Sequence, residues 1–208
     1  MNRRHLFLLA GAWALGACGK RRPRVAALKA DARVLALGDS LTVGYGAAPE
    51  QAWPAQLAQL TGWQVDNEGV NGDTSAGALQ RLEALLSANS YDAVLVGIGG
   101  NDMLRSVALS STKASVAAIA RMALAHTPYV ALIATPAPEP LRAAAGALGD
   151  AGFYAELAEA EKVLLIPGVY AAVLSDPALR SDRIHANAQG YAAVAQQLAD
   201  QLEAAGWR

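Results

Sequence analysis

Short apolar runs alternate with longer amphipathic stretches along most of this chain. The first run, residues 34–38, stops at turn residues and is too short for a stable helix, so it predicts a buried strand. Further runs predict strands at residues 64–67, 91–98, 129–134 and 163–166. The run at 91–98 is apolar almost throughout, which is typical of a sheet that is covered on both faces.

Helices are predicted between these strands from the spacing of apolar residues and from the breakers that flank them. The expected helices cover residues 53–61, 75–88, 111–125, 153–162 and 188–205. The proline-rich residues 135–140 predict irregular structure. Because strands alternate with helices, we expect an α/β protein with a doubly wound parallel sheet flanked by helices.

Composition limits the domain organisation and the partners. The chain has 208 residues, of which 53% are hydrophobic, and this is enough for the core of one ordinary α/β domain. The formal net charge of -1 gives no field that would attract nucleic acid, so no nucleic-acid partner is expected.

The N-terminus is typical of a targeting segment, with two arginines, an apolar run over residues 6–15 and then small residues. The run ends in Leu15-Gly16-Ala17-Cys18, which resembles the lipobox of bacterial lipoprotein signals. This resemblance implies a signal peptide at 1–18, a lipid on Cys18 that anchors the protein to a membrane of the cell envelope, facing the periplasm, and a linker at 19–32. The alternative is a simple secretory signal with an incidental cysteine, although Cys18 is the only cysteine in the chain.

The first predicted strand ends in Gly38-Asp39-Ser40. In an open parallel sheet the carboxyl ends of the strands face the crevice where ligands bind, so a hydroxyl at this position is exposed to substrate. Ser40 is therefore a candidate nucleophile. The alternative is a plain turn, because all three residues favour turns.

Two further loops are expected at the same edge of the sheet, one holding Gly72 and one holding Asn101. Acyl transfer by a serine requires hydrogen-bond donors aimed at a developing negative charge. The backbone N–H groups of Ser40 and Gly72 and the side-chain amide of Asn101 are candidate donors. Alternatively, Gly72 serves only a turn and Asn101 only caps a helix.

A serine nucleophile also needs a base, and the chain has three histidines. His5 lies in the predicted leader and His126 at the end of a predicted helix, away from the candidate site, which leaves His185. Asp182 precedes His185 by three positions, a spacing that brings side chains onto one face of a helical turn. Asp182 is then expected to orient His185, which takes the proton of Ser40. The alternative is a surface turn with an incidental histidine.

Four blocks of this sequence together resemble the SGNH, or GDSL, hydrolase family. They are Gly38-Asp39-Ser40-Leu41, Asn71-Gly72-Asp73-Thr74, Gly99-Gly100-Asn101-Asp102 and Asp182-Arg183-Ile184-His185. The similarity covers residues 33–208 and is strongest to the thioesterase I/lysophospholipase L1 and arylesterase branch. It implies a flavodoxin-like three-layer α/β/α sandwich, a triad of Ser40, Asp182 and His185, an oxyanion hole of Ser40, Gly72 and Asn101, and no metal or organic cofactor.

The chain departs from the family pattern in the last block. Arg183 and Ala186 stand where relatives commonly have glycine and proline, which leaves the triad residues intact. Thr42 occupies the last position of a Gly-x-Ser-x-Gly pattern, so the nucleophile elbow of α/β-hydrolases is not matched.

The leading functional hypothesis is a serine esterase that forms an acyl-enzyme on carboxylic esters, including lysophospholipids or acyl thioesters. The alternatives are a polysaccharide deacetylase of the same fold and a non-catalytic envelope protein that binds lipid or glycan. Residues 135–153 are apolar and contain several glycines, so they are expected to form a mobile wall of the acyl pocket. A plain connection packed on the sheet edge is the alternative.

Overall fold

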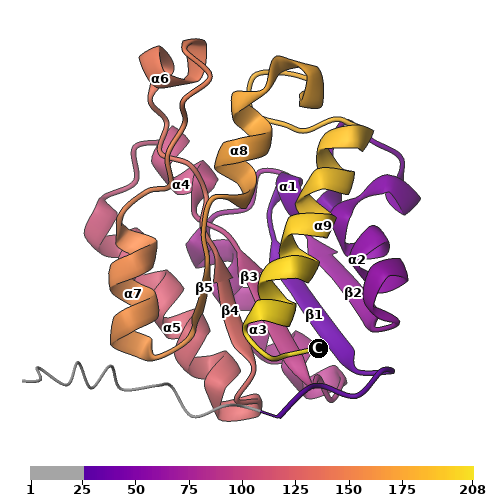
Figure 1. Ribbon diagram of the computed structural model, residues 1–208. Helices are drawn as coiled ribbons and strands as arrows, with labels where there is room; N and C mark the ends of the chain where they lie inside the picture. Colours follow the sequence, from indigo (N-terminus) through magenta and orange to yellow (C-terminus); the bar gives the residue numbers. More distant parts are fainter. Residues whose placement is uncertain (1–25) are drawn as a thin grey trace, which may run out of the picture.

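The computed structural model describes residues 26–208 and has an α/β fold (Figure 1). Five parallel strands form one sheet in the order β2-β1-β3-β4-β5. The strands are β1 (Arg33–Gly38), β2 (Gln64–Gly69), β3 (Ala93–Gly97), β4 (Val130–Ile133) and β5 (Leu164–Ile166). This strand order is the flavodoxin-like one, so the fold class expected from the sequence is confirmed.

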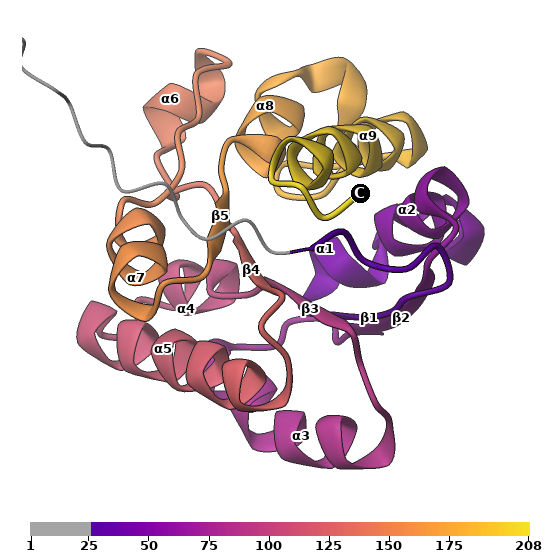
Figure 2. The same ribbon diagram turned by 60° about the horizontal axis from the view of Figure 1, so that its bottom comes forward.

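Helices cover both faces of the sheet (Figure 2). One layer contains α3 (Ser75–Ala88), α5 (Leu109–His126) and α7 (Phe153–Glu161), and the other contains α2 (Trp53–Thr61), α8 (Val169–Ser175) and α9 (Ala188–Ala204). The core lies on both sides of the sheet because side chains alternate along each strand. In β1, Val34 and Ala36 pack toward α2, α8 and α9, while Leu35 and Leu37 pack toward α3, α5 and α7.

Four helices occur where the sequence predicts none. They are α1 (Ser40–Val43), α4 (Gly100–Leu104), α6 (Pro140–Ala144) and α8. Each has four to seven residues, which is too short to show a helical period. The prediction of irregular structure for 135–140 is wrong only at its end, since Pro140 begins α6, where a proline is tolerated. Two 3-10 helices, η1 (Pro49–Gln51) and η2 (Pro177–Leu179), complete the set found in residues 26–208.

Residues 26–32 of the expected linker lie against the domain. The N–H of Leu28 donates to the Trp207 carbonyl over 2.9 Å, and the Tyr129 hydroxyl donates to the Ala26 carbonyl. Ala32 is buried. The expected signal peptide at 1–18, including Cys18 and His5, lies outside the described residues. Within residues 26–208, no helix has both the length and the apolar character needed to cross a membrane.

Candidate active site

Ser40 stands where β1 turns directly into α1. The backbone can turn this tightly because Gly38 has no side chain: a Cβ there would lie 2.1 Å from Thr42 Oγ1 and 2.6 Å from the Gly97 carbonyl. Asp39 caps the new helix, since its Oδ1 accepts a hydrogen bond of 3.0 Å from the N–H of Leu41. Ser40 is consequently the first residue of α1, at the carboxyl end of a central strand.

His185 and Asp182 complete a hydrogen-bonded chain with Ser40. The distance from His185 Nε2 to Ser40 Oγ is 3.0 Å, and the distance from His185 Nδ1 to Asp182 Oδ2 is 2.7 Å. Ser40 in α1 and the loop that holds Asp182 and His185 are at least 142 positions apart in the sequence (182 − 40). Serine, imidazole and carboxylate in this order form the arrangement that activates a serine hydroxyl as a nucleophile.

The loop that carries Asp182 and His185 is not helical, so the predicted helical turn is wrong. A backbone bridge between Arg180 and Ala186 closes the loop. Inside it, Asp182 Oδ1 accepts hydrogen bonds of 2.8 Å from the N–H groups of both Ile184 and His185. This local turn fixes the carboxylate against the imidazole without a helix.

Hydrogen bonding keeps Asp182 ionised. Partial burial alone would raise the pKa of Asp182, but the hydrogen bonds from the His185 ring and from the N–H groups of Ile184 and His185 outweigh it and lower the pKa below its usual 3.8. An ionised Asp182 holds the proton of His185 on Nδ1, which leaves Nε2 free to accept a proton from Ser40.

Asn101 lies beside Asp39 and borders the same cavity as Ser40. It is the second residue of α4, and its Nδ2 donates to Asp39 Oδ2 over 3.3 Å. An amide nitrogen carries two hydrogens, so this bond leaves one N–H of Asn101 for a further acceptor. Asn101 does not cap α4, because the N-cap residue is Gly99 and no side chain makes a capping hydrogen bond there.

Gly72 lies in the loop after β2 with a φ of 73°, a conformation that favours glycine. Its carbonyl accepts a hydrogen bond of 2.8 Å from Arg105, and it is not among the residues that line the cavity beside Ser40. The loop itself is held next to the site, because the N–H of Val70 donates to the Gly38 carbonyl over 3.1 Å. The structure thus brings Ser40 and Asn101 to one cavity and places Gly72 in an adjoining loop.

Asp39 is a site residue that the sequence analysis missed. It is 3% exposed, and its burial raises the pKa of the carboxyl from 3.8 to about 6. The N–H of Leu41, the nearby His185 and the amide of Asn101 oppose this rise. The position of Asp39 directly before a helix is a recognisable capping signal, but its burial depends on tertiary packing.

Tyr45 and Gly46 support the catalytic loop and were also missed. The rings of Tyr45 and His185 lie with their centroids 4.5 Å apart. Gly46 has a φ of 93°, and a Cβ there would lie 2.2 Å from Ser181 Oγ. His126, which the sequence places away from the site, accepts a hydrogen bond from the N–H of Tyr91, before the amino end of β3.

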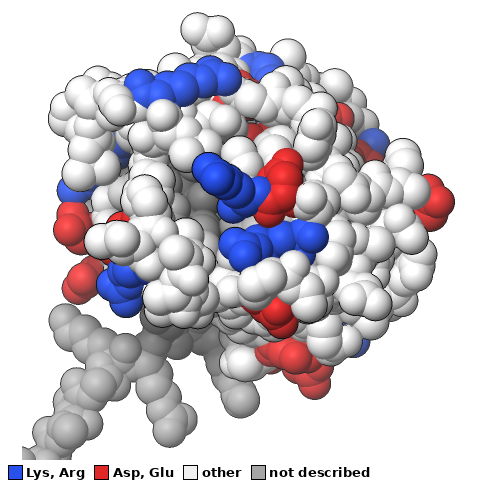
Figure 3. Space-filling view, turned by 90° about the horizontal axis from the view of Figure 1, so that it is seen from above, with Lys and Arg blue, Asp and Glu red and all other residues white. Residues whose placement is uncertain are grey.

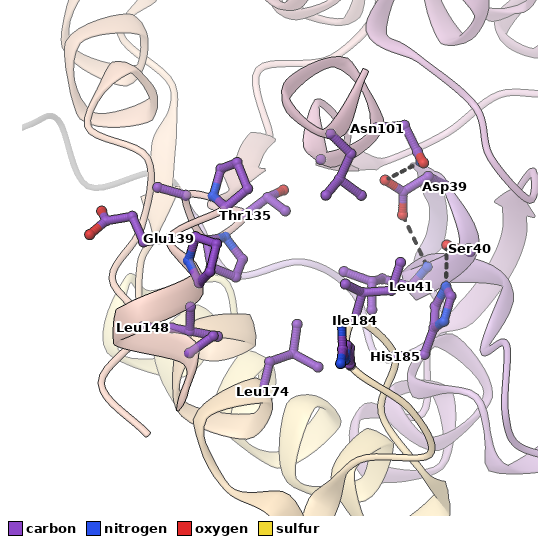
Figure 4. A pocket seen from close by; sticks show the side chains of 18 residues that line it. Asp39, Ser40, Leu41, Asn101, Thr135, Glu139, Leu148, Leu174, Ile184 and His185 are labelled. Carbon is purple, nitrogen blue, oxygen red and sulfur yellow. Dashed lines mark hydrogen bonds between the residues drawn. The ribbon is translucent and has the colours of Figure 1, made fainter. Parts of the chain in front are cut away.

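An apolar cavity of about 270 Å³ opens next to Ser40 (Figure 4). One wall consists of residues 135–140, Ala143 and Leu148. Leu174 of α8 also lines the cavity. The segment expected to form the acyl wall therefore borders the cavity. Within residues 26–208, no group of three His, Cys, Asp or Glu side chains is placed to hold a metal ion.

Comparison with known proteins is consistent with this geometry. The model of the GDSL-like Lipase/Acylhydrolase family matches residues 36–193. The chain is 34% identical to Thioesterase 1/protease 1/lysophospholipase L1 of Escherichia coli (strain K12) over 82% of this chain and 83% of that protein. It is 34% identical to Esterase TesA of Pseudomonas aeruginosa, over 50% of this chain and only 55% of that protein. A crystal structure of TesA superposes with a TM-score of 0.73 at 27% identity, covering 83% of this chain and 99% of that one.

Proposed function

The chain belongs to the GDSL-like lipase/acylhydrolase family of serine ester hydrolases, and from this premise we propose that Ser40 carries out its chemistry through an acyl-enzyme. The observation that carries the proposal is the chain of contacts from Ser40 Oγ through His185 to Asp182 at the mouth of an apolar cavity. These contacts supply a nucleophile, a base and an orienting carboxylate in one place.

In the first step, Ser40 Oγ attacks the ester carbonyl carbon while His185 Nε2 takes the hydroxyl proton. The carbonyl oxygen becomes an oxyanion. Its donors are the second N–H of the Asn101 amide and the backbone N–H groups of Ser40 and Gly72, which act more strongly on this oxyanion than on the ester carbonyl. Asp182 stabilises the imidazolium that has formed.

The intermediate then expels the alcohol or thiol, which receives the proton from His185 Nε2. This leaves the acyl group on Ser40. In the second half of the reaction, His185 takes a proton from water, and the water oxygen bonds to the acyl carbon. The bond from the acyl carbon to Ser40 Oγ then breaks, Ser40 Oγ takes the proton back from His185, and the carboxylic acid leaves. No metal or organic cofactor enters any of these steps.

The cavity favours substrates with an apolar acyl group. It is largely apolar and opens beside Ser40, so an acyl chain can leave water there while its carbonyl carbon lies near the nucleophile. The E. coli relative is named as a thioesterase and a lysophospholipase. Carboxylic esters, acyl thioesters and lysophospholipids are accordingly the proposed substrates.

We also propose that the protein works in the cell envelope, attached through a lipid on Cys18. The support comes from the sequence alone, where an apolar run ends in Leu15-Gly16-Ala17-Cys18. The same sequence pattern makes the periplasmic face of a membrane the proposed location.

Turnover of p-nitrophenyl octanoate by residues 26–208 tests the mechanism. Ser40→Ala and His185→Ala should each lower kcat by about 10³-fold or more, because each removes one part of a unit that acts together. A fluorophosphonate should label the wild type and not Ser40→Ala. Ser110→Ala, which changes an exposed serine of α5, is the matched control and should retain both turnover and labelling.

Wild-type turnover in a Ser40→Ala protein with an unchanged melting temperature would contradict the proposed mechanism. The melting temperature separates this result from a failure to fold.

A further inference from the structure

Arg183 lies between the two residues that serve the nucleophile, Asp182 and His185. Its side chain is exposed and lines the cavity that also contains Ser40. Figure 3 shows the face of the molecule that carries α6 and α8, where Lys and Arg side chains lie beside a hollow, with an acidic side chain against those at the centre. The cavity is otherwise largely apolar, and an apolar acyl chain makes no hydrogen bond to a cation such as Arg183.

Among residues 26–208, no carboxylate pairs with Arg183. The carboxylate of the neighbouring Asp182 faces the His185 ring and two backbone N–H groups, from which it accepts hydrogen bonds. The carboxylate of Glu139, which also borders the cavity, points away from it (Figure 4) and lies 3.7 Å from Arg142. In the part of the chain that the structure describes, Arg183 forms no ion pair.

The position of Arg183 indicates which part of the substrate it meets. His185 Nε2 delivers the proton to the departing oxygen or sulfur, so the leaving group lies on the side of the 180–186 loop. The acyl chain lies against the other wall, formed by residues 135–140 and Leu148. Arg183 projects from the same loop as His185 and hence borders the space of the leaving group.

We infer that Arg183 binds a phosphate group carried on the alcohol or thiol part of the substrate. The guanidinium is planar, always charged and able to donate two parallel hydrogen bonds, which matches a phosphate. Phosphate on the leaving group occurs in lysophospholipids, where it lies a few bonds beyond the ester oxygen, and in coenzyme A thioesters, where it lies at the far end of the pantetheine arm. The inference rests on the proposed esterase function and narrows its substrates to anionic esters.

Two matched substrate pairs test this inference and distinguish the two sources of phosphate. Octanoyl-lysophosphatidic acid and monooctanoylglycerol share the acyl chain and the glycerol and differ in the phosphate. Octanoyl-coenzyme A and octanoyl-pantetheine share the thioester and the pantetheine arm and differ in the phosphorylated nucleotide. For each pair the measured quantity is the ratio of kcat/KM for the anionic substrate to that for the neutral one.

In Arg183→Gln at least one of these ratios should fall by about fivefold to tenfold, the range between an exposed ion pair and a hydrogen bond to a charged group. Arg183→Lys should recover only part of the loss, because an ammonium cannot form the bidentate contact. The ratio in the wild type should also fall as salt is raised. Arg142→Gln is the matched control: it removes the same charge from α6, outside the cavity lining, and should leave the ratios at the wild-type level.

A fall confined to the glycerol pair supports a lysophospholipid as the source, and a fall confined to the thioester pair supports coenzyme A. Ratios that do not change in Arg183→Gln, or that fall equally in Arg142→Gln, overturn the inference. Binding of lysophosphatidic acid and of monooctanoylglycerol to the Ser40→Ala variant, measured by calorimetry, tests Arg183 even if the proposed chemistry fails. The phosphate should strengthen binding to Ser40→Ala by about fivefold or more, and this gain should vanish when Arg183→Gln is added.

Discussion

Two carboxylates near Ser40 have opposite pKa shifts, and their surroundings explain the difference. Asp39 is 3% exposed and has a raised pKa because burial disfavours its charge. The side chain of Asp182 is 45% exposed, and hydrogen bonds lower its pKa. Asp182 touches the imidazole directly, whereas Asp39 touches the amide of Asn101. Asp39 is therefore a positioning residue that orients the amide of Asn101, the proposed oxyanion donor.

The buried carboxyl of Asp39 makes the free energy of unfolding depend on pH. Its pKa is about 6 in the folded protein and about 3.8 when unfolded, so its contribution to stability is fully present below pH 3.8 and is lost as the pH rises through 6. A rise of two pKa units corresponds to about 3 kcal/mol. This contribution is therefore absent at pH 8.

We predict that Asp39→Asn stabilises the protein at pH 8 and impairs catalysis. The neutral side chain avoids the cost of a buried charge, so the melting temperature should exceed that of the wild type by several degrees at pH 8, with a smaller difference at pH 4.5. The new amide places a donor against the Asn101 amide, which must turn, and kcat should fall by about 10-fold to 100-fold with little change in KM.

A double-mutant cycle checks that Asp39 acts through Asn101. Asn101→Ala alone should lower kcat by about 10²-fold to 10³-fold. Adding Asp39→Asn to it should lower kcat little further, because the group that Asp39 positions is already gone. Equal falls in both backgrounds would assign Asp39 a different part in the site.

The segment between β4 and α7 forms one wall of the cavity. An isolated bridge joins Pro136 to Asp150, and the chain between them projects from the body of the molecule and carries α6 (Figure 1). Leu141 is 87% exposed on this projection, whereas Leu148 faces the cavity. Two leucines of one segment thus have opposite surroundings.

We predict that Leu148→Asp raises KM for p-nitrophenyl octanoate by about tenfold and for the acetate by less than twofold. A charge at an apolar wall opposes burial of a long acyl chain, and acetate does not reach that wall. Leu141→Asp adds the same charge to the exposed side of the segment and is the matched control. Equal changes in KM for the two esters in Leu148→Asp would show that this wall does not hold the acyl chain.

The long elements could be predicted from the sequence, and several short ones could not. Helices such as α2 and α9 have enough turns for an apolar face to show, and the predicted bounds of α2 match the structure. β2 was expected to end at Asn67 but continues to Gly69, because pairing with Gly38 of β1 extends it beyond its apolar residues. α1 and α4 have only four and five residues, and their helical form depends on the strands that precede them.

The same contrast holds for the site. Spacing and chain order indicate that Ser40, Asp182 and His185 meet, because each belongs to a recognisable block. The burial of Asp39, and the lack of an ion pair to Arg183 within residues 26–208, depend on which side chains surround these residues in three dimensions. A sequence gives residue types at a site, whereas charge balance and burial require the packed structure.

For the whole molecule, the start of the described chain and the cavity lie at opposite ends of the sheet. Ala26 accepts a hydrogen bond from Tyr129, directly before β4, so it lies at the amino ends of the strands. Ser40 follows the carboxyl end of β1. The part of the chain that would carry a lipid on Cys18 therefore joins the described domain at the end away from the cavity.

This arrangement leads us to predict that attachment and catalysis are separable. In bacteria that express the full chain, Cys18→Ser should abolish labelling by a fatty acid and move the protein from the membrane fraction to the soluble fraction, because each buried CH₂ of an acyl chain contributes about 0.8 kcal/mol. The kcat/KM for a water-soluble ester should stay within about twofold of the wild type, since the described chain begins at the end opposite Ser40. Unmodified Cys18 in the mass spectrum of the wild-type protein, or membrane fractionation of Cys18→Ser, would contradict the lipid anchor while leaving the proposed chemistry of Ser40 untouched.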